Sequence, residues 1–406
     1  MLTFKNAKSI SGELKDLSVS SNQNETIDAS KLTIFPGLID PHVHFRTPGL
    51  EHKEDWRTAA KAAIAGGYTM VFDMPNTIPP TVTKEILQEK KQIIDQQLKE
   101  VDIPLRYELF FGADKQHFDQ IHRVQDQIIG IKVFMGCSTG NLVIDDNSSL
   151  HAIFAIASKF NLLIAVHAED EHLMQERKKL FTGKTDYSIH SEIRNREVAA
   201  RAVEKAIYLS KLYSVKLYLL HTSTQDEMEL IKKAKQDGLL VYAETSPHHL
   251  FLNTSFYERL KGRALMNPPL REKQDQDALW QAIHDNVIDT IGSDHAPHTL
   301  DEKSKPYGEC PSGVPGIETM LPLLITAYHE GLLPLEKIVS LTSTRPREIF
   351  NLPETNDFVL VDLEMEKLVS DANLQTKCHW SPFSGMNLKG WPVYVCLRDR
   401  VLRITS

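Results

Sequence analysis

Four histidines and one aspartate stand at the ends of short apolar runs in this sequence. His42 and His44 lie two residues apart in PHVHFR, while His167 closes the run in LLIAVHAED, His221 closes LYLLHTST, and Asp294 lies in IGSDHAPH. In an extended strand, residues i and i+2 point to the same side, so the first two histidines can hold one ion together. Nitrogen and oxygen ligands without thiolates suit a catalytic zinc site with a position open for water. The residue types therefore favour a zinc centre that activates water for hydrolysis.

Each of these signals is weak when it is taken alone. An H-x-H pair also arises as two partly exposed histidines, and a lone histidine after a buried strand is more often a hydrogen-bonded core residue than a ligand. Asp294 can be a carboxylate ligand, a general base or both, or it can cap a helix or a turn. The joint pattern favours the metal site, because all five residues fall at the same end of successive strands, where a barrel places its active site.

Lys132 stands inside the apolar run GIKVFMG, where a charged ammonium is costly to bury. Burial lowers the pKa of a lysine, and a neutral amine can react with carbon dioxide to give a carbamate whose oxygens can bridge two cations. The alternative is a lysine that reaches the rim of the barrel or pairs with Asp294 or Glu169. The residues alone leave both alternatives open.

Short apolar runs rich in β-branched residues alternate with helical patterns such as DWRTAAKAAIAGG from about residue 35 to about residue 350. This alternation is typical of repeated βα units that build a parallel sheet. The fold class is therefore α/β, and a TIM-like (β/α)8 barrel is the natural closure. The expected strands span residues 38–44, 70–74, 107–112, 129–135, 162–167, 216–221, 239–245 and 288–294.

The two ends of the chain have a different pattern, with short strands separated by polar residues and without the helices of the barrel. Residues 1–35 form one such stretch, and DFVLVDLE and WPVYVCLRDRVLRIT lie in the other. We expect the ends to pair into a small β domain of residues 1–35 and 355–406, with residues 36–354 forming the hydrolase barrel.

Composition and charge argue against a nucleic acid or a membrane as a partner. The 406 residues include 41% hydrophobic and 25% charged residues, as in ordinary globular proteins, and the net charge of -8 disfavours a phosphate backbone. No run of about eighteen apolar residues occurs, and MLTFKNAKSISGELKD lacks the apolar core of a signal peptide. The four cysteines are scattered and form no C-x-x-C pair, which disfavours a thiolate metal site. We therefore expect a cytoplasmic protein.

The candidate residues lie in longer segments that resemble the dihydroorotase family of the amidohydrolase superfamily over nearly the whole chain. The segments are PGLIDPHVHFR, AGGYTMVFDMPNT, GIKVFMG, HAED, MNPPLR, SDHAPH, GVPGIET and WSPFSGMNLKGWPV. The resemblance implies two zinc ions per chain, bridged by a carbamylated lysine. Their ligands would be His42, His44 and Asp294 for the first ion, His167 and His221 for the second, and Lys132 for the bridge.

The resemblance also implies the substrate and the reaction. Arg46, Asn76 and His298 would bind the carboxylate of dihydroorotate, since a planar guanidinium pairs well with a carboxylate, and Asn267 would lie against the ring. The implied reaction is the reversible hydrolysis of (S)-dihydroorotate to N-carbamoyl-L-aspartate, a step of pyrimidine synthesis. Asp294 would accept the proton of the attacking water and pass it to the leaving nitrogen. Without the resemblance, Arg46 would be a rim salt-bridge residue, and Asn76 and Asn267 would be turn residues beside prolines.

Two other functions share much of this pattern. A dihydropyrimidinase, hydantoinase or allantoinase would keep the metal ligands and differ in its substrate contacts. An inactive homologue that serves as a subunit beside a carbamoyltransferase would be expected to have lost ligands that this chain retains. The resemblance further implies a homo-oligomer, and it leaves a carbamoyltransferase open as a partner.

The segment CSTGN, residues 137–141, is the candidate for a loop that closes over the substrate. In this hypothesis Ser138 or Thr139 would donate hydrogen bonds to the substrate. An ordinary glycine-containing loop is the alternative.

Overall fold

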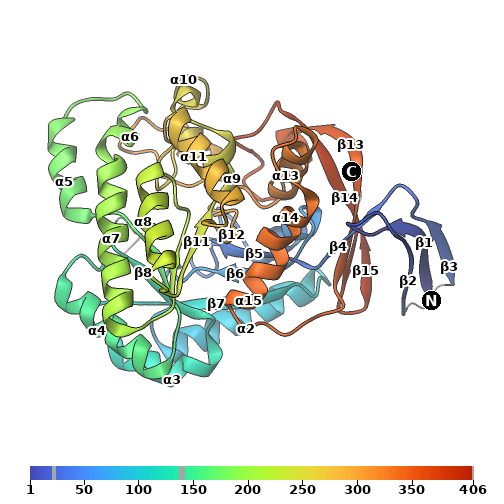
Figure 1. Cartoon of the computed structure of the whole chain (residues 1–406), viewed down its shortest axis with the longest axis horizontal. Coiled ribbons are helices and arrows are strands. Elements are labelled where there is room, and N and C mark those ends of the chain that lie inside the picture. Colours follow the sequence, from blue (N-terminus) through green and yellow to red (C-terminus); the bar gives the residue numbers. More distant parts are fainter. Residues whose placement is uncertain (21–23, 137–141, 405–406) are drawn as a thin grey trace.

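Eight parallel strands form one sheet in the computed structural model, which describes residues 1–20, 24–136 and 142–404. The strands follow one another in chain order, and a parallel bridge between Val43 and His295 places the first strand beside the segment that follows the last, so the barrel is nearly closed (Figure 1). The expected α/β barrel is therefore confirmed. The strands are β5 (Leu38–Val43), β6 (Tyr68–Asp73), β7 (Arg106–Gly112), β8 (Gly130–Phe134), β9 (Ile164–His167), β10 (Leu217–Leu219), β11 (Val241–Thr245) and β12 (Thr290–Ile291).

Helices follow the strands and cover the outside of the barrel (Figure 1). Side-chain caps start several of them; Asp55, for example, accepts hydrogen bonds from two backbone N–H groups of the first helix, and Thr224 and Glu227 form a capping box. The helices are α1 (Trp56–Ala65), α2 (Lys84–Glu100), α3 (Ile121–Val124), α4 (Asn147–Phe160), α5 (Glu171–Leu180), α6 (Ile189–Ile193), α7 (Arg196–Tyr213), α8 (Gln225–Gln236), α9 (Pro247–Phe251), α10 (Tyr257–Leu260), α11 (Lys273–His284), α12 (Leu300–Lys303), α13 (Met320–His329), α14 (Leu335–Val339) and α15 (Arg345–Ile349). Within the described parts of the chain, no helix is both long enough and apolar enough to span a lipid bilayer.

The barrel strands are apolar on both faces, because neighbouring residues of one strand pack into different clusters. On β7, for example, Phe111 joins the large core between sheet and helices, whereas Phe110 joins a smaller cluster with Phe72 and Tyr218. Phe350, which follows α15, packs against all three rings of this smaller cluster, with centroids 4.9 to 6.1 Å away. Aromatic side chains therefore fill the smaller cluster, as expected for a barrel with a packed interior.

A second sheet joins the two ends of the chain at one side of the barrel (Figure 1). Its strands are β1 (Leu2–Lys8), β2 (Leu14–Val19), β3 (Glu25–Asp28), β4 (Thr33–Pro36), β13 (Phe358–Leu368), β14 (Asn387–Leu397) and β15 (Arg400–Arg403). The connection between the ends is the antiparallel pairing of β4 with β13, from Pro36 opposite Phe358 to Thr33 opposite Val361. The division into domains at residues 35/36 and 354/355 stays a prediction.

Lys90 of α2 is a buried cation that fastens this helix to the end of β6. Its Nζ lies 2.6 Å from a carboxylate oxygen of Asp73 and donates to the carbonyl oxygen of Met74 at 2.9 Å. Asp73 in turn accepts the backbone N–H of Phe45 at 2.8 Å. The buried pair of Lys90 and Asp73 thus joins α2, β6 and the turn after β5.

We expect the variant Lys90→Met to lower the free energy of unfolding by about 3 to 5 kcal/mol, because it leaves the Asp73 carboxylate buried without its cation. Urea denaturation measures the change. The matched control is Lys273→Met, which removes an exposed ion pair with Asp277 and should cost less than about 0.5 kcal/mol. Equal effects of the two variants would contradict the role of the buried pair.

Candidate metal centre and active site

A cavity of about 240 Å³ opens among the segments at the carboxyl ends of the barrel strands. All of the sequence-predicted site residues except His42 line it, and His42 lies buried beside it against His44 and Asp294. The structure therefore brings together the predicted metal-ligand and substrate-binding residues that it describes. The predicted residues that line the cavity are His44, Arg46, Asn76, Lys132, His167, His221, Asn267, Asp294 and His298.

His42, His44 and Asp294 form a buried cluster with ligand atoms within 4.8 Å of one another. Asp294 Oδ1 lies 3.3 Å from His42 Nε2 and 3.2 Å from His44 Nε2. On the far side of each ring, His42 Nδ1 donates to Glu244 Oε1 and His44 Nδ1 donates to Asn76 Oδ1, both at 2.7 Å. These outer acceptors fix the tautomer of each ring, so both Nε2 lone pairs point toward the cluster.

His167 and His221 form a second pair beside the first cluster. His167 Nε2 donates to Glu169 Oε2 at 2.7 Å, and its Nδ1 lies 2.9 Å from His221 Nε2. The ring centroids of His221 and His42 are 5.2 Å apart, so the two groups adjoin. The buried Nδ1 of His221 has no hydrogen-bond partner among the described residues.

These donors suit a cation. Burial lowers the pKa of His42 to about 3 and that of His44 to about 4, so both rings are neutral at pH 7 and carry a free lone pair. The two lone pairs face each other across 3.2 Å, an arrangement that is repulsive unless a positive charge lies between them. Asp294 adds a carboxylate oxygen that faces both of these ring nitrogens. Imidazole and carboxylate ligands without a thiolate are the set that catalytic zinc prefers.

Lys132 lies on β8 and is almost fully buried, at 1% exposure. Burial lowers its pKa to about 7. The carboxylates that sequence offers as partners bind other groups: Asp294 lies against His42 and His44, and Glu169 lies against His167 and Arg194. The Lys132 ammonium instead lies 4.6 Å from the centroid of the Phe134 ring. A substantial fraction of the amine is therefore neutral near pH 7.

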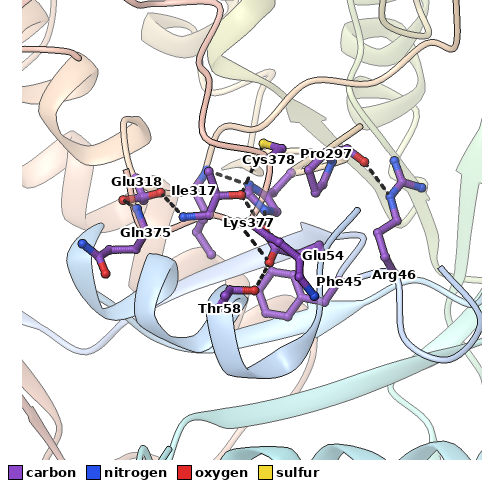
Figure 2. Close-up of polar contacts among 12 residues, drawn as sticks. Phe45, Arg46, Glu54, Thr58, Pro297, Ile317, Glu318, Gln375, Lys377 and Cys378 are labelled. Carbon is purple, nitrogen blue, oxygen red and sulfur yellow. Dashed lines mark hydrogen bonds and ion pairs between the residues drawn. The ribbon is translucent and has the colours of Figure 1, made fainter. Parts of the chain in front are cut away.

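Arg46 and His298 lie together at the other side of the cavity. Arg46 Nε donates to the carbonyl oxygen of Pro297 at 3.1 Å (Figure 2). Its Nη2 lies 3.2 Å from His298 Nε2. Burial lowers the pKa of Arg46 to about 10, and burial together with the Arg46 charge lowers that of His298 to about 3. Arg46 is only 5% exposed, and among the described residues no carboxylate forms an ion pair with it.

Three cavity residues hold an unusual backbone conformation. Arg46, His221 and Asp294 have φ angles of +64°, +36° and +45°, in the region that favours glycine. Such conformations persist only where the surrounding structure fixes them, and they concentrate at functional sites. The turns after β5, β10 and β12 thereby aim these side chains into the cavity.

Sequence reasoning missed several residues that shape the site. Glu244 orients His42, and Arg194 and Ser312 line the cavity. Glu169 was considered only as a partner for Lys132, yet it orients His167. A buried acid in VYAET and an acid two residues after His167 in HAED are the signals that could have identified the two glutamates.

Asn267 lies in the cavity wall, where its Oδ1 is 2.9 Å from His190 Nε2. The CSTGN segment, with Ser138 and Thr139, lies outside the described residues.

Comparison with known proteins agrees with this geometry. The model of the Amidohydrolase family matches residues 33–396. The dihydroorotase of Methanosarcina acetivorans is 35% identical over 404 residues, which cover 96% of this chain and 85% of that protein. This chain belongs to the dihydroorotases of the amidohydrolase family.

This chain is also similar to part of a larger multifunctional protein and to solved structures of related enzymes. The multifunctional protein CAD of Squalus acanthias is 35% identical over 382 residues, which cover 94% of this chain and 15% of that protein. Among solved structures, the L-hydantoinase (dihydropyrimidinase) of Arthrobacter aurescens has a TM-score of 0.91 at 27% identity, covering 99% of this chain and 96% of that one.

We expect Zn²⁺ added to metal-free protein to raise the melting temperature, because a ligand of the native state alone stabilises it. At a hundredfold its dissociation constant the ion adds about 2.7 kcal/mol, or roughly 3 °C for a chain of this size. The variant His44→Ala should lose most of this shift, whereas His52→Ala, at an exposed histidine, should keep it. A shift that is the same in both variants would contradict a metal site at His44.

Proposed function

We propose that this dihydroorotase interconverts (S)-dihydroorotate and N-carbamoyl-L-aspartate in the cavity at the mouth of the barrel. The observation that carries this proposal is the Arg46 guanidinium, which is buried beside the histidine cluster without a carboxylate partner among the described residues. A buried cation is stabilised by an anion of matching geometry. The carboxylate of dihydroorotate supplies that anion.

Two zinc ions would be held by the buried donors. In this proposal His42, His44 and Asp294 would hold one ion, His167 and His221 would hold the other, and a carbamate on Lys132 would supply oxygen ligands to both. Three features support it: the outer N–H groups of three histidines are already bonded, His221 Nδ1 lacks a partner within the described parts of the chain, and the Lys132 amine is partly neutral near pH 7. When bound, such ions lower the pKa of water toward neutrality and polarise a carbonyl oxygen.

The residues on the Arg46 side orient the substrate. The guanidinium of Arg46 and the ring of His298 bind the substrate carboxylate. Asn76 accepts from His44 through Oδ1, so its amide nitrogen is the end that can donate to the same carboxylate. Asn267, in the wall of the cavity, lies against the ring of the substrate. These contacts set the amide carbonyl of the ring toward the histidine cluster.

Asp294 moves the proton. Its carboxylate is ionised at neutral pH and lies between the ligand histidines and the cavity, so it accepts the proton of the attacking water. It then gives this proton to the ring nitrogen as the amide bond breaks, which yields the ureido group of carbamoyl aspartate. Ring closure runs through the same steps in reverse.

The first test concerns Arg46. Wild-type protein should hydrolyse dihydroorotate and leave dihydrouracil, which has no carboxylate, nearly untouched. The variant Arg46→Met should lower kcat/KM for dihydroorotate by about a hundredfold or more, the usual cost of removing one partner of a buried charge pair. Steady-state assays on both substrates measure this. A wild-type preference for dihydrouracil would favour the alternative function, an amidase for uncharged rings.

The second test concerns Asp294. The variant Asp294→Asn keeps an oxygen ligand but cannot take up the proton, so kcat should fall by about 10²-fold to 10⁴-fold. Zinc content and dihydroorotate binding, measured on the same sample, should stay near their wild-type values. Near-normal turnover would contradict the base assignment.

Partners and location complete the proposal. The similarity to one part of a multifunctional protein supports assembly with other enzymes, a carbamoyltransferase among them, and we retain the homo-oligomer and the cytoplasmic location as predictions. Loss of a ligand would favour an inactive subunit instead, yet each predicted ligand is present and buried. The chain is therefore equipped to act as an enzyme.

A further inference from the structure

Glu54 is a fully buried carboxylate that joins three distant parts of the chain. It precedes α1 and accepts the hydroxyl of Thr58 from that helix. From the C-terminal part of the chain it accepts Thr376 Oγ1 at 2.5 Å and the backbone N–H of Lys377 at 3.2 Å. Its Oε2 also lies 3.4 Å from His295 Nε2, in the segment that follows β12 (Figure 2 shows Glu54, Thr58 and Lys377).

His295 is held by both its ring and its backbone. The backbone N–H groups of Gly316 and Ile317 approach Nδ1 at 3.2 and 3.5 Å, so Nδ1 is the acceptor and the ring proton lies on Nε2, facing Glu54. The backbone N–H of His44 donates to the carbonyl oxygen of His295 at 2.8 Å. The Glu54 carboxylate is therefore the acceptor that completes the fixation of this ring.

Asp294 depends on that fixation. Its φ angle of +45° is unfavourable for an aspartate and persists only while the neighbouring residues hold it. On one side the backbone N–H of Ser293 donates to Asp40 Oδ1 at 3.0 Å. On the other side, Asp294 is followed directly by His295. The direction of the Asp294 carboxylate thus rests on two flanking residues, one of which is held by Glu54.

The same C-terminal segment also contacts the loop that follows β12 at a second position, near His298. Trp380 is fully buried, and its Nε1–H donates to the carbonyl oxygen of His298 at 2.7 Å. The start of the segment is fixed by another buried carboxylate, Glu318, which accepts the backbone N–H groups of Gln375 and Thr376 at 2.8 and 2.9 Å (Figure 2 shows Glu318 and Gln375). Residues 375–380 therefore support the loop that carries both Asp294 and His298, although they belong to neither the strands nor the helices of the barrel.

We propose that Thr376 and Trp380 of this segment position the two reactive side chains of this loop at separate points: Thr376 holds Glu54, which with His295 directs Asp294, and Trp380 directs His298. Glu54 and Trp380 are positioning residues, since they act through other groups. The proposal rests on the proposed function, which gives Asp294 the proton and His298 the substrate carboxylate. The proposal predicts two different effects. Loss of the contact between Glu54 and His295 should lower kcat, and loss of the contact between Trp380 and His298 should weaken substrate binding.

Lys377 offers a matched control within the same segment. Its Nζ donates to the carbonyl oxygen of Glu51 and lies 2.6 Å from Asp55 Oδ2, at the start of α1. These contacts fasten the segment without touching His295 or His298. The variant Lys377→Met should therefore lower stability while kcat and KM remain unchanged.

The experiment compares Glu54→Gln, Trp380→Phe and Lys377→Met with wild-type protein loaded with zinc. Each is measured for kcat and KM on dihydroorotate, for binding of orotate, the flat unsaturated analogue, and for melting temperature. Glu54→Gln replaces an oxygen by an NH2 group among donors, so kcat should fall about tenfold to a hundredfold with KM and orotate binding within about twofold. Trp380→Phe keeps an aromatic ring but loses the N–H, so KM and the orotate Kd should rise about fivefold while kcat stays within about twofold.

The expected split separates positioning from general destabilisation. If Glu54→Gln and Trp380→Phe change only the melting temperature, as Lys377→Met should, or change kcat and KM in the same proportion, the proposal is overturned. If Glu54→Gln does not fold, Thr376→Val removes one donor to the same carboxylate oxygen, and an unchanged kcat in that variant overturns the proposal equally. A wild-type chain that does not turn over dihydroorotate contradicts the proposed function, whereas an active wild type without the split contradicts only the positioning.

Discussion

The site depends on the contact between two buried, neutral imidazole rings whose lone pairs face each other. The 3.2 Å contact between His42 Nε2 and His44 Nε2 is unfavourable without a cation, and burial prevents a proton from relieving it, because it lowers the pKa of both rings to about 3 and 4. Each ring keeps its orientation through the acceptor behind it, Glu244 or Asn76. Because water is excluded from this buried cluster, the electrostatic interactions among its side chains are stronger than they would be in solvent. The barrel mouth is thus organised to receive positive charge on this side and, at Arg46, negative charge on the other.

The barrel brings these groups together because its strands are parallel. All carboxyl ends meet at one rim, so residues far apart in sequence need only lie at or just beyond a strand end to become neighbours. The positive φ angles of Arg46, His221 and Asp294 then turn the chain sharply after β5, β10 and β12. Such turns are costly for these residue types, and contacts of the residues around them offset the cost. The pairing of Phe45 N–H with Asp73, and of Asp73 with Lys90, is one of these contacts.

The sequence was sufficient to predict the barrel and the candidate residues at its rim, because these residues stand in or close to the apolar runs that form the strands. Prediction was weaker where a residue's environment comes from a distant segment. Glu244 can be recognised in VYAET as a buried acid, but nothing in that segment assigns it to His42, and nothing local links Glu54 to Thr376. The last strand is also shorter than expected, Thr290–Ile291 instead of residues 288–294, and Asp294 itself lies in a turn with a positive φ angle. For Lys132, the sequence alone leaves open whether the amine pairs with Asp294 or Glu169 or is partly neutral. The structure disfavours the ion pair, because both carboxylates are bonded to other groups.

Substrate choice must reside in a few side chains rather than in the fold. The backbone of this chain matches that of an L-hydantoinase with a TM-score of 0.91, so the architecture itself cannot select one cyclic amide over another. Under the proposed function the distinguishing group is Arg46, whose hydrogen-bond partners within the described chain are the Pro297 carbonyl and the His298 ring, both neutral. An uncharged ring would leave this cation buried and unpaired, at a cost of about 2 to 5 kcal/mol relative to a carboxylate-bearing ring. A difference of that size corresponds to about thirtyfold to several-thousandfold in kcat/KM, enough for one buried charge to set the specificity of a shared barrel.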